Sequence, residues 1–235
     1  MKKLAVITGG TKGIGKAIIE NFAAEGYSIA TCSRTESDLQ ALQKQILTIY
    51  PDLDFLYMPA DLAQKGQVKS FADMIHKSGI PVEVVVNNSG LFIPGQIHDE
   101  EDGMLEKMID TNLYSAYHLS RALLKPMMER KKGHIFNICS TASIIPYTNG
   151  GSYCIAKFAM LGMSKVLREE MKPHNIRVTS VLPGATYTAS WEGTDLPEER
   201  FMKAEDVADT VMAAFKLSDR AVLEEVLIRP LLGDL

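Results

Sequence analysis

Short apolar runs alternate with amphipathic segments along the whole chain. The runs are rich in Val and Ile and apolar on both sides, as parallel strands covered by helices on both faces require. The predicted strands span residues 4–7, 28–32, 54–58, 82–86, 133–139, 177–182 and 222–228. The amphipathic segments predict helices over residues 13–25, 36–49, 67–76, 102–130, 153–171 and 204–217.

This alternation predicts the fold class. Repeated strand-then-helix units imply right-handed crossovers and a doubly wound α/β sheet. No linker or low-complexity stretch interrupts the pattern, so residues 1–235 are expected to form one domain. Residues 186–200 alone lack clear patterning, and their place between a strand and a helix makes them a candidate lid.

Composition narrows the function classes. Of the 235 residues, 46% are hydrophobic, and the formal net charge of −4 argues against nucleic acid as the main partner. No apolar run reaches ~18 residues, so no membrane span is expected. The short apolar start of the chain ends at a glycine turn, which favours a strand over a signal peptide. Three cysteines without a Cys-x-x-Cys spacing argue against a disulfide framework and for a reduced, cytoplasmic location.

A glycine-rich turn, residues 8–15, joins the first predicted strand to the first helix. Its GxxxGxG spacing differs from the commoner GxGxxG, and by itself it could be an ordinary turn. Glycines let a pyrophosphate approach the backbone, and the helix N-terminus offers N–H groups and partial positive charge. In this strand–turn–helix context the turn predicts dinucleotide binding. The expected contacts are Gly9, Thr11, Lys12, Gly13, Ile14 and Gly15.

The end of the second predicted strand selects the cofactor. NAD enzymes usually place a carboxylate there for the ribose 2′-hydroxyl, whereas this chain has Ser33 and Arg34, with no acidic residue before Glu36. Arg34 can bind a 2′-phosphate bidentately, and Lys12 adds charge near it. The alternative is that both are solvated surface cations. The residues predict NADP(H).

Tyr153 and Lys157 stand four residues apart, so they share one face of a helix. An ammonium held near a phenol favours the phenolate form. Ser140, at the end of the fifth predicted strand, is placed to hydrogen-bond a substrate oxygen. A Tyr-x-x-x-Lys pair by itself is a weak signal, because surface helices often carry such pairs.

The glycine turn, the Asn87-Asn88-Ser89-Gly90 segment, Asn112, Ser140, Tyr153-x-x-x-Lys157 and Pro183-Gly184 occur in one order. In this the chain resembles the short-chain dehydrogenase/reductase family over nearly its whole length. The resemblance implies a Rossmann-type sheet of about seven parallel strands and hydride transfer between a nicotinamide and a carbonyl or alcohol. Ser89 departs from the alanine usual in the family, a small change that should be tolerated.

The resemblance also implies roles for individual residues. Tyr153 is expected to be the general acid/base, Lys157 to assist it and hold the nicotinamide ribose, and Ser140 to donate to the substrate oxygen. Asn112 is expected to anchor a water that leads protons to the lysine, although a buried asparagine can also merely satisfy backbone groups. The remaining cofactor contacts implied are Asp61, Leu62, Asn88, Ser89, Gly90, Pro183, Gly184, Thr186 and Thr188, with Asn87 supporting the central sheet. Asp61 could equally be the N-cap of the next helix.

The substrate pocket is expected at the carboxyl ends of the strands. Its candidate walls are Leu91, Phe92, Tyr147, Tyr187 and Trp191. Trp191 could stack on a flat substrate or pack the lid onto the body. Residues 183–191 and the tail 224–234 resemble the bacterial sepiapterin-reductase-like branch, which implies a pterin side-chain ketone or similar small dicarbonyl.

Two alternatives remain open. A 3-oxoacyl-carrier-protein reductase would use a basic patch for its acidic carrier, and the basic residues between 121 and 132 offer one, although they also fit a solvated helix face. A non-catalytic NADP-binding sensor or scaffold would bind cofactor without turnover.

The five histidines show no ligand spacing, so no metal is expected. Cys139 and Cys154 adjoin catalytic candidates, but buried packing is the expected role rather than redox sensing. The resemblance implies homodimers or homotetramers, with helices 102–130 and 153–171 pairing with their symmetry mates.

Overall fold

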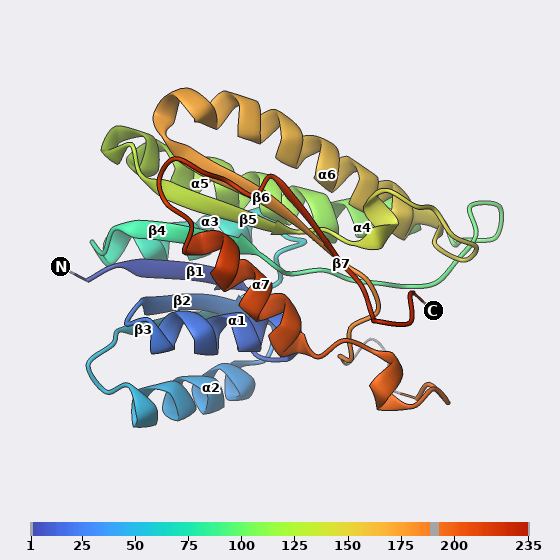
Figure 1. Cartoon of the computed structure of the whole chain (residues 1–235), viewed down its shortest axis with the longest axis horizontal. Helices are drawn as coiled ribbons and strands as arrows, with labels where there is room; N and C mark the ends of the chain where they lie inside the picture. The colour runs from blue at the N-terminus through green and yellow to red at the C-terminus, as the bar shows by residue number, and fades with distance from the viewer. Residues whose placement is uncertain (1, 189–192, 235) are drawn as a thin grey trace.

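The computed structural model describes residues 2–188 and 193–234. Its centre is a seven-stranded sheet in the order β3-β2-β1-β4-β5-β6-β7, in which all neighbouring pairs are parallel (Figure 1). The strands are β1 (Leu4–Thr8), β2 (Ser28–Ser33), β3 (Phe55–Pro59), β4 (Val82–Asn87), β5 (Gly133–Ile138), β6 (Ile176–Pro183) and β7 (Glu225–Ile228). This order confirms the predicted doubly wound α/β sheet.

Helices cover both faces of the sheet, α1, α2 and α7 on one and α3, α5 and α6 on the other (Figure 1). Their bounds are α1 (Gly13–Ala24), α2 (Glu36–Ile49), α3 (Lys65–Lys77), α4 (Met104–Ile109), α5 (Ser115–Arg130), α6 (Gly151–Met171) and α7 (Ala204–Phe215). Strand β1 shows why the pattern gives two layers. Ala5 and Ile7 pack toward the first set of helices, while Leu4 and Val6 pack toward the second.

The predicted long helix over residues 102–130 is wrong in detail. It divides into α4, a π-helical turn at Asp110–Tyr114, and α5. No proline or glycine within 104–124 marks the break; the π turn instead carries the fully buried Asn112, whose contacts are described below. The last strand is also shorter than predicted, since β7 begins at Glu225 rather than residue 222.

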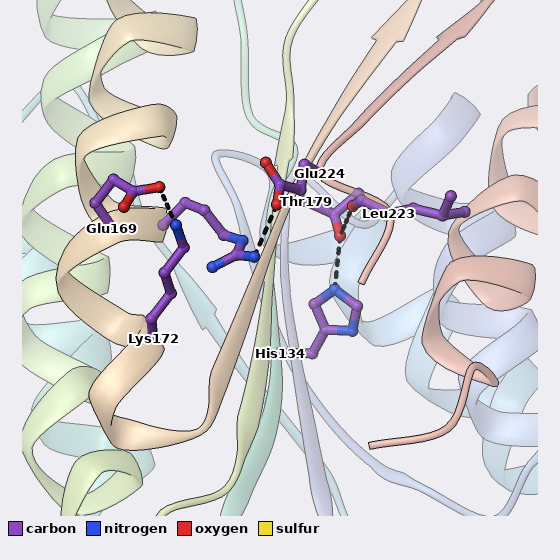
Figure 2. A network of polar contacts seen from close by, with 7 residues as sticks. His134, Glu169, Lys172, Thr179, Leu223 and Glu224 are labelled. Carbon is purple, nitrogen blue, oxygen red and sulfur yellow. Dashed lines mark hydrogen bonds and ion pairs between the residues drawn. The ribbon is translucent and has the colours of Figure 1, made fainter. Parts of the chain in front are cut away.

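A buried histidine on β5 is connected through β6 to the segment that leads into the edge strand β7 (Figure 2). Thr179 Oγ1 on β6 donates to the Leu223 carbonyl at 2.6 Å and lies 2.8 Å from His134 Nε2 on β5. Because the single hydroxyl hydrogen goes to the carbonyl, Nε2 must carry its own hydrogen, and Nδ1 is left without a partner among the residues that the structure describes. Burial, aided by the charge of Arg177, lowers the pKa of His134 well below its ordinary value.

Candidate active site

The predicted site residues gather at the carboxyl edge of the sheet, where the strand order reverses between β1 and β4. The glycine turn follows β1, and Asn88 and Ser89 follow β4. The backbone N–H groups of Asn88 and Ser89 donate to Thr8 Oγ1 at 3.0 and 2.9 Å. The Asn88 side chain donates to the carbonyls of Thr8 and Gly9 at 2.9 and 3.2 Å. These four bonds join the two halves of the sheet at the turn.

The glycine turn has a shape that side chains would destroy. Gly9 and Gly13 adopt positive φ values of 64° and 51°. A Cβ at Gly15 would lie 2.3 Å from the Gly9 carbonyl oxygen and 2.5 Å from Asn88 Nδ2. The helix α1 begins here at Gly13, so its first N–H groups face this cradle. A backbone-lined cradle at a helix N-terminus fits a pyrophosphate.

Lys157 lies beside Tyr153 on the same face of α6. Its side chain is buried, with the residue 4% exposed, and Nζ donates to the Ile138 carbonyl at 2.9 Å. The same Nζ is 5.8 Å from the centroid of the Tyr153 ring. Gly90, in the loop after β4, lies close to it, since a Cβ there would be 3.7 Å from Lys157 Nζ, an ordinary van der Waals distance. The structure therefore brings the phenol, the ammonium and the loop after β4 together.

Asn112 uses its side chain to hold the loop after β4. Its Nδ2 donates to the carbonyls of Leu91 at 3.0 Å and Met108 at 3.1 Å, and its Oδ1 accepts from the Leu91 N–H at 3.1 Å. The residue is 0% exposed. Asn112 thus satisfies backbone groups, the alternative role considered for it. The role of anchoring a water stays a prediction.

Ser140 follows β5 and caps the short helical turn Thr141–Ser143. Its Oγ accepts from the Ala142 N–H at 3.1 Å, while its own N–H donates to Ser143 Oγ at 3.2 Å. Accepting through a lone pair leaves the hydroxyl hydrogen to be donated elsewhere. Ser140 is half-buried, so its hydroxyl is fixed in position by the cap while the residue stays partly exposed.

The residues proposed to bind the 2′-phosphate are exposed to solvent. Arg34 is exposed. The Lys12 side chain is 72% exposed, and its Nζ lies 3.8 Å from Asp38 Oδ2. The sequence argument did not anticipate Asp38, an acid on the first turn of α2 that offsets part of the Lys12 charge. An exposed pair of this kind is weak, about 0–1 kcal/mol, so a ligand phosphate can compete for the lysine. Ser33 Oγ donates locally to the Thr35 carbonyl at 3.4 Å.

Asp61 and Leu62 lie in the turn after β3. Asp61 Oδ1 accepts from the Ala63 N–H at 3.0 Å, and Leu62 is buried in the core. Helix α3 begins only at Lys65, with Gln64 at its N-cap, so the N-cap alternative for Asp61 is wrong.

The segment after β6 closes over the glycine turn. The Gly184 N–H donates to the Ile228 carbonyl at 2.8 Å, and Thr186 Oγ1 donates to the Gly184 carbonyl at 3.1 Å. A Cβ at Gly13 would lie 3.0 Å from the Thr188 methyl carbon, which places Thr188 directly above the turn. Pro183, the last residue of β6, pairs with Ile228 of β7. These predicted cofactor contacts are therefore brought together with the cradle.

The structure brings together some of the residues predicted to line the substrate pocket. The Phe92 ring stands edge-on to Tyr153, with centroids 4.9 Å apart. Leu91 is half-buried, and the Tyr187 ring lies 5.6 Å from that of Phe201. Trp191 lies outside the described residues. Tyr147 lines a cavity of about 630 Å³ at the start of α6. Burial raises the pKa of Tyr147, with smaller contributions from Tyr153 and Cys154.

Cys139 and Cys154 are buried and free, as expected for packing residues. Burial raises the pKa of Cys139 to about 11, so at neutral pH it is a thiol rather than a reactive thiolate.

The sequence analysis missed one acidic residue near the site. Glu100, from the loop before α4, contacts the first turn of α6, and nothing in its acidic sequence surroundings distinguishes it from a solvated side chain.

A family model for short chain dehydrogenases matches residues 3–198. The chain belongs to the short-chain dehydrogenase family. This confirms the resemblance drawn from the motifs, and it makes the protein an oxidoreductase of the class that acts on alcohols and carbonyls.

Two named relatives of this short-chain dehydrogenase illustrate the range of the family. It is 30% identical over 243 residues to sepiapterin reductase of Chlorobaculum tepidum, with coverage of 100% of this chain and 99% of the relative. It is 33% identical over 187 residues to 3alpha-hydroxysteroid dehydrogenase of Mediterraneibacter gnavus, with coverage of 79% and 74%.

Solved structures agree with the fold. L-sorbose reductase of Gluconobacter frateurii, in complex with NADPH and L-sorbose, superposes with a TM-score of 0.90 at 25% identity, covering 97% of this chain and 95% of that one. An alcohol dehydrogenase of the archaeon Thermococcus sibiricus, complexed with 5-hydroxy-NADP, gives 0.89 at 25% identity, covering 98% and 97%.

Within residues 2–188 and 193–234, no cluster of three or more His, Cys, Asp or Glu is suited to hold a metal ion. No helix in the same part of the chain has the length and apolar character needed to cross a membrane.

Proposed function

We propose that this short-chain dehydrogenase is an NADP(H)-dependent enzyme that reduces a carbonyl, or oxidises the matching alcohol, of a small substrate. The observation that carries the proposal is the buried Lys157 ammonium, fixed by the Ile138 carbonyl and lying beside the Tyr153 ring. We also propose that residues 1–235 work as one domain, since the glycine turn and Tyr153 belong to a single sheet edge.

The cofactor would be held by the backbone of the glycine turn, with Arg34 and Lys12 at a 2′-phosphate and Thr188 above the turn. Several neighbours of similar fold were solved with NADP or NADPH, which supports this cofactor. When bound, a nicotinamide dinucleotide supplies or accepts a hydride.

The chain's own residues handle the proton and the developing charge. In the reductive direction, the Tyr153 hydroxyl gives its proton to the substrate oxygen, while the Ser140 hydroxyl donates a hydrogen bond to the same oxygen. Lys157 stabilises the phenolate that remains, because its ammonium is buried where water screens it little. Asn112 holds the loop at Leu91, next to the Phe92 ring that packs against Tyr153.

A small dicarbonyl or a pterin side-chain ketone is the substrate class we propose, supported by the full-length similarity to a sepiapterin reductase. An acyl-carrier-protein thioester is the second candidate. The basic stretch it would use is partly occupied, because Arg130 donates to the Val82 carbonyl at 2.6 Å and Lys132 pairs with Glu83 at 3.1 Å. The small carbonyl is therefore favoured.

The test is a panel of pterins, diketones and acyl thioesters with NADPH, followed by cofactor absorbance. Reduction of one class with a saturable rate supports the proposal. NADPH binding without reduction of any compound would instead favour a sensor or scaffold.

Tyr153→Phe separates chemistry from binding. Loss of the hydroxyl is expected to lower kcat by about 10²–10⁴-fold while NADPH affinity, measured by fluorescence titration, stays similar. Equal loss of both would contradict a proton-transfer role for Tyr153.

We further propose a homodimer or homotetramer built on α5 and α6. Apolar side chains on these helices face solvent in the single chain: Tyr117, Ile155, Phe158 and Val166. Light scattering coupled to size exclusion tests this, and a monomer at micromolar concentration would refute it.

A further inference from the structure

Glu100 contacts the helix that carries the proposed acid and base. Its Oε1 accepts from the backbone N–H of Ser152 at 2.8 Å, and its Oε2 accepts from the Ser152 hydroxyl. Ser152 is buried and directly precedes Tyr153. The carboxylate also lies at the N-terminus of α6, where the helix dipole favours negative charge. Both oxygens of one side chain are thus engaged with the turn that presents Tyr153.

The loop around Glu100 is attached to the same turn at further points. The Gly95 N–H donates to the Asn149 carbonyl at 3.0 Å, and Gln96 Nε2 donates to Asn149 Oδ1 at 2.9 Å. Gly95 also forms a parallel bridge with Gly150. We call residues 95–100 and 149–152, with these contacts, the clasp.

Two glycines of the clasp lie close against the Glu100 side chain. A Cβ at Gly95 would lie 2.7 Å from Glu100 Cγ, and one at Gly151 would lie 2.1 Å from Glu100 Oε1. Gly151 also has a positive φ of 28°. The two glycines let the carboxylate lie directly against the helix start, so the fit depends on this one side chain.

The other end of the same loop is fixed to the catalytic residues. The Asn112 side chain hydrogen-bonds both the N–H and the carbonyl of Leu91, and the Phe92 ring packs against the Tyr153 ring. The loop 91–100 is therefore held at one end by Asn112 and Phe92 and at the other by Glu100. Both ends of this loop thus contact the part of the molecule that carries or surrounds Tyr153.

We propose that Glu100 is a positioning residue that orients Tyr153 for proton transfer by holding the first turn of α6 against the loop 91–100. The proposal rests on the proposed function of Tyr153. Glu100 is not among the residues assigned above to the substrate or the cofactor, and its effect should appear in kcat rather than in binding.

Three variants test it. Glu100→Ala removes both acceptors and is expected to lower kcat by about 10–100-fold, since small misplacements of reacting groups are costly. Glu100→Gln keeps an acceptor for the Ser152 N–H and places an NH₂ donor at the Ser152 hydroxyl, so it should restore kcat to within about threefold of wild type. Glu101→Ala, at the exposed neighbouring acid, is the matched control and should leave kcat unchanged.

The NADPH dissociation constant of Glu100→Ala should stay within about threefold of wild type, because none of the clasp contacts described above involves the glycine turn. A kcat within threefold of wild type would overturn the proposal. So would a parallel loss of NADPH affinity, or a failure of Glu100→Gln to recover kcat.

A readout without turnover separates this proposal from the proposed function. Amide hydrogen exchange of residues 149–157 should be faster in Glu100→Ala than in wild type and Glu101→Ala, while exchange in β1 and α1 stays the same. If Glu100→Ala does not fold, Ser152→Ala provides the same comparison with one acceptor contact kept. Should the wild-type enzyme reduce no carbonyl, the proposed function fails and the role in orienting Tyr153 fails with it. Unchanged exchange in an active enzyme overturns the clasp alone.

Discussion

The glycine turn after β1 and the first two turns of α6 lie at the same sheet edge but define their sites in opposite ways. In the glycine turn the missing side chains matter, since Gly15 has the Gly9 carbonyl 2.3 Å from where a Cβ would be. In α6 the side chains matter, and each depends on a partner far along the chain. Lys157 binds the Ile138 carbonyl, and Ser152 binds Glu100. The local sequence can specify the backbone conformation of a glycine turn. The direction of a side chain in α6 depends instead on partners elsewhere in the chain.

The two lysines of the site show the same contrast. Lys12 is 72% exposed and lies 3.8 Å from Asp38, so it can move to a ligand. Lys157 is 4% exposed and has a backbone partner, so its charge is already in place.

Replacing the fixed lysine should have the largest effect. Lys157→Met keeps most of the volume but removes the charge, and we expect kcat to fall by about 10²–10⁴-fold. The Ile138 carbonyl also loses a donor, which should cost about 1–3 kcal/mol of stability. Steady-state kinetics with thermal unfolding checks both. Lys165→Met, at an exposed lysine further along α6, is the control, and a similar loss of kcat there would remove the distinction.

Adding one carbon to the glycine turn should have the next largest effect. Gly15→Ala forces the turn or Asn88 to shift, and overpacking of this kind costs about 1–3 kcal/mol. Because the strain falls on the cradle, NADPH affinity should drop by about 5–100-fold, as measured by calorimetry. Gly66→Ala in α3 has open space around the added carbon and should leave affinity unchanged. Equal affinities in the two variants would mean that the turn is not the cofactor cradle.

Part of the fold and part of the candidate site could be predicted from the sequence, and part could not. The glycines, Tyr153 and Lys157 are visible because their spacing matches a turn and one helix face. The π-helical turn at Asp110–Tyr114 is not visible, because it depends on Asn112 bonding to Leu91, 21 residues away. Glu100 is hidden for the same reason, since its partner lies 52 residues further on.

The exposed cations should give a smaller and more selective effect. Arg34→Ala is expected to weaken NADPH binding by about tenfold or more, through loss of charge-assisted hydrogen bonds, and to leave NADH binding unchanged. The ratio of the two dissociation constants is the measurement. If NADH is already the tighter ligand in wild type, the assignment of Arg34 to a 2′-phosphate is wrong.

The smallest expected effect lies outside both regions, at His134. Its pKa is lowered in the folded protein, while in the unfolded chain it titrates near ~6.5. Below that pH the unfolded chain binds a proton that the folded protein does not. This contribution to stability is therefore fully present above about pH 6.5 and decreases as the pH falls, by at most about 1.4 kcal/mol per pH unit.

Urea unfolding of wild type and His134→Gln between pH 7.5 and 5.5 measures this contribution. The variant should lose less stability on acidification, whereas His98→Gln, at an exposed position, should behave as wild type. Parallel curves for wild type and His134→Gln would show that His134 does not control the acid response.

The reversal of strand order also governs when the protein can work during its synthesis. The Thr8 hydroxyl forms hydrogen bonds with Val86, Asn88 and Ser89, which lie about 80 residues further along the chain, because β1 pairs with β4. A nascent chain that has left the ribosome only as far as β3 already has all its turn glycines but not the residues that brace them. Non-local pairing of this kind forms late, since the intervening chain must first be ordered. We therefore expect the proposed dinucleotide site to form only once the fourth strand has emerged, and the proposed chemistry at Tyr153 only once α6 has followed.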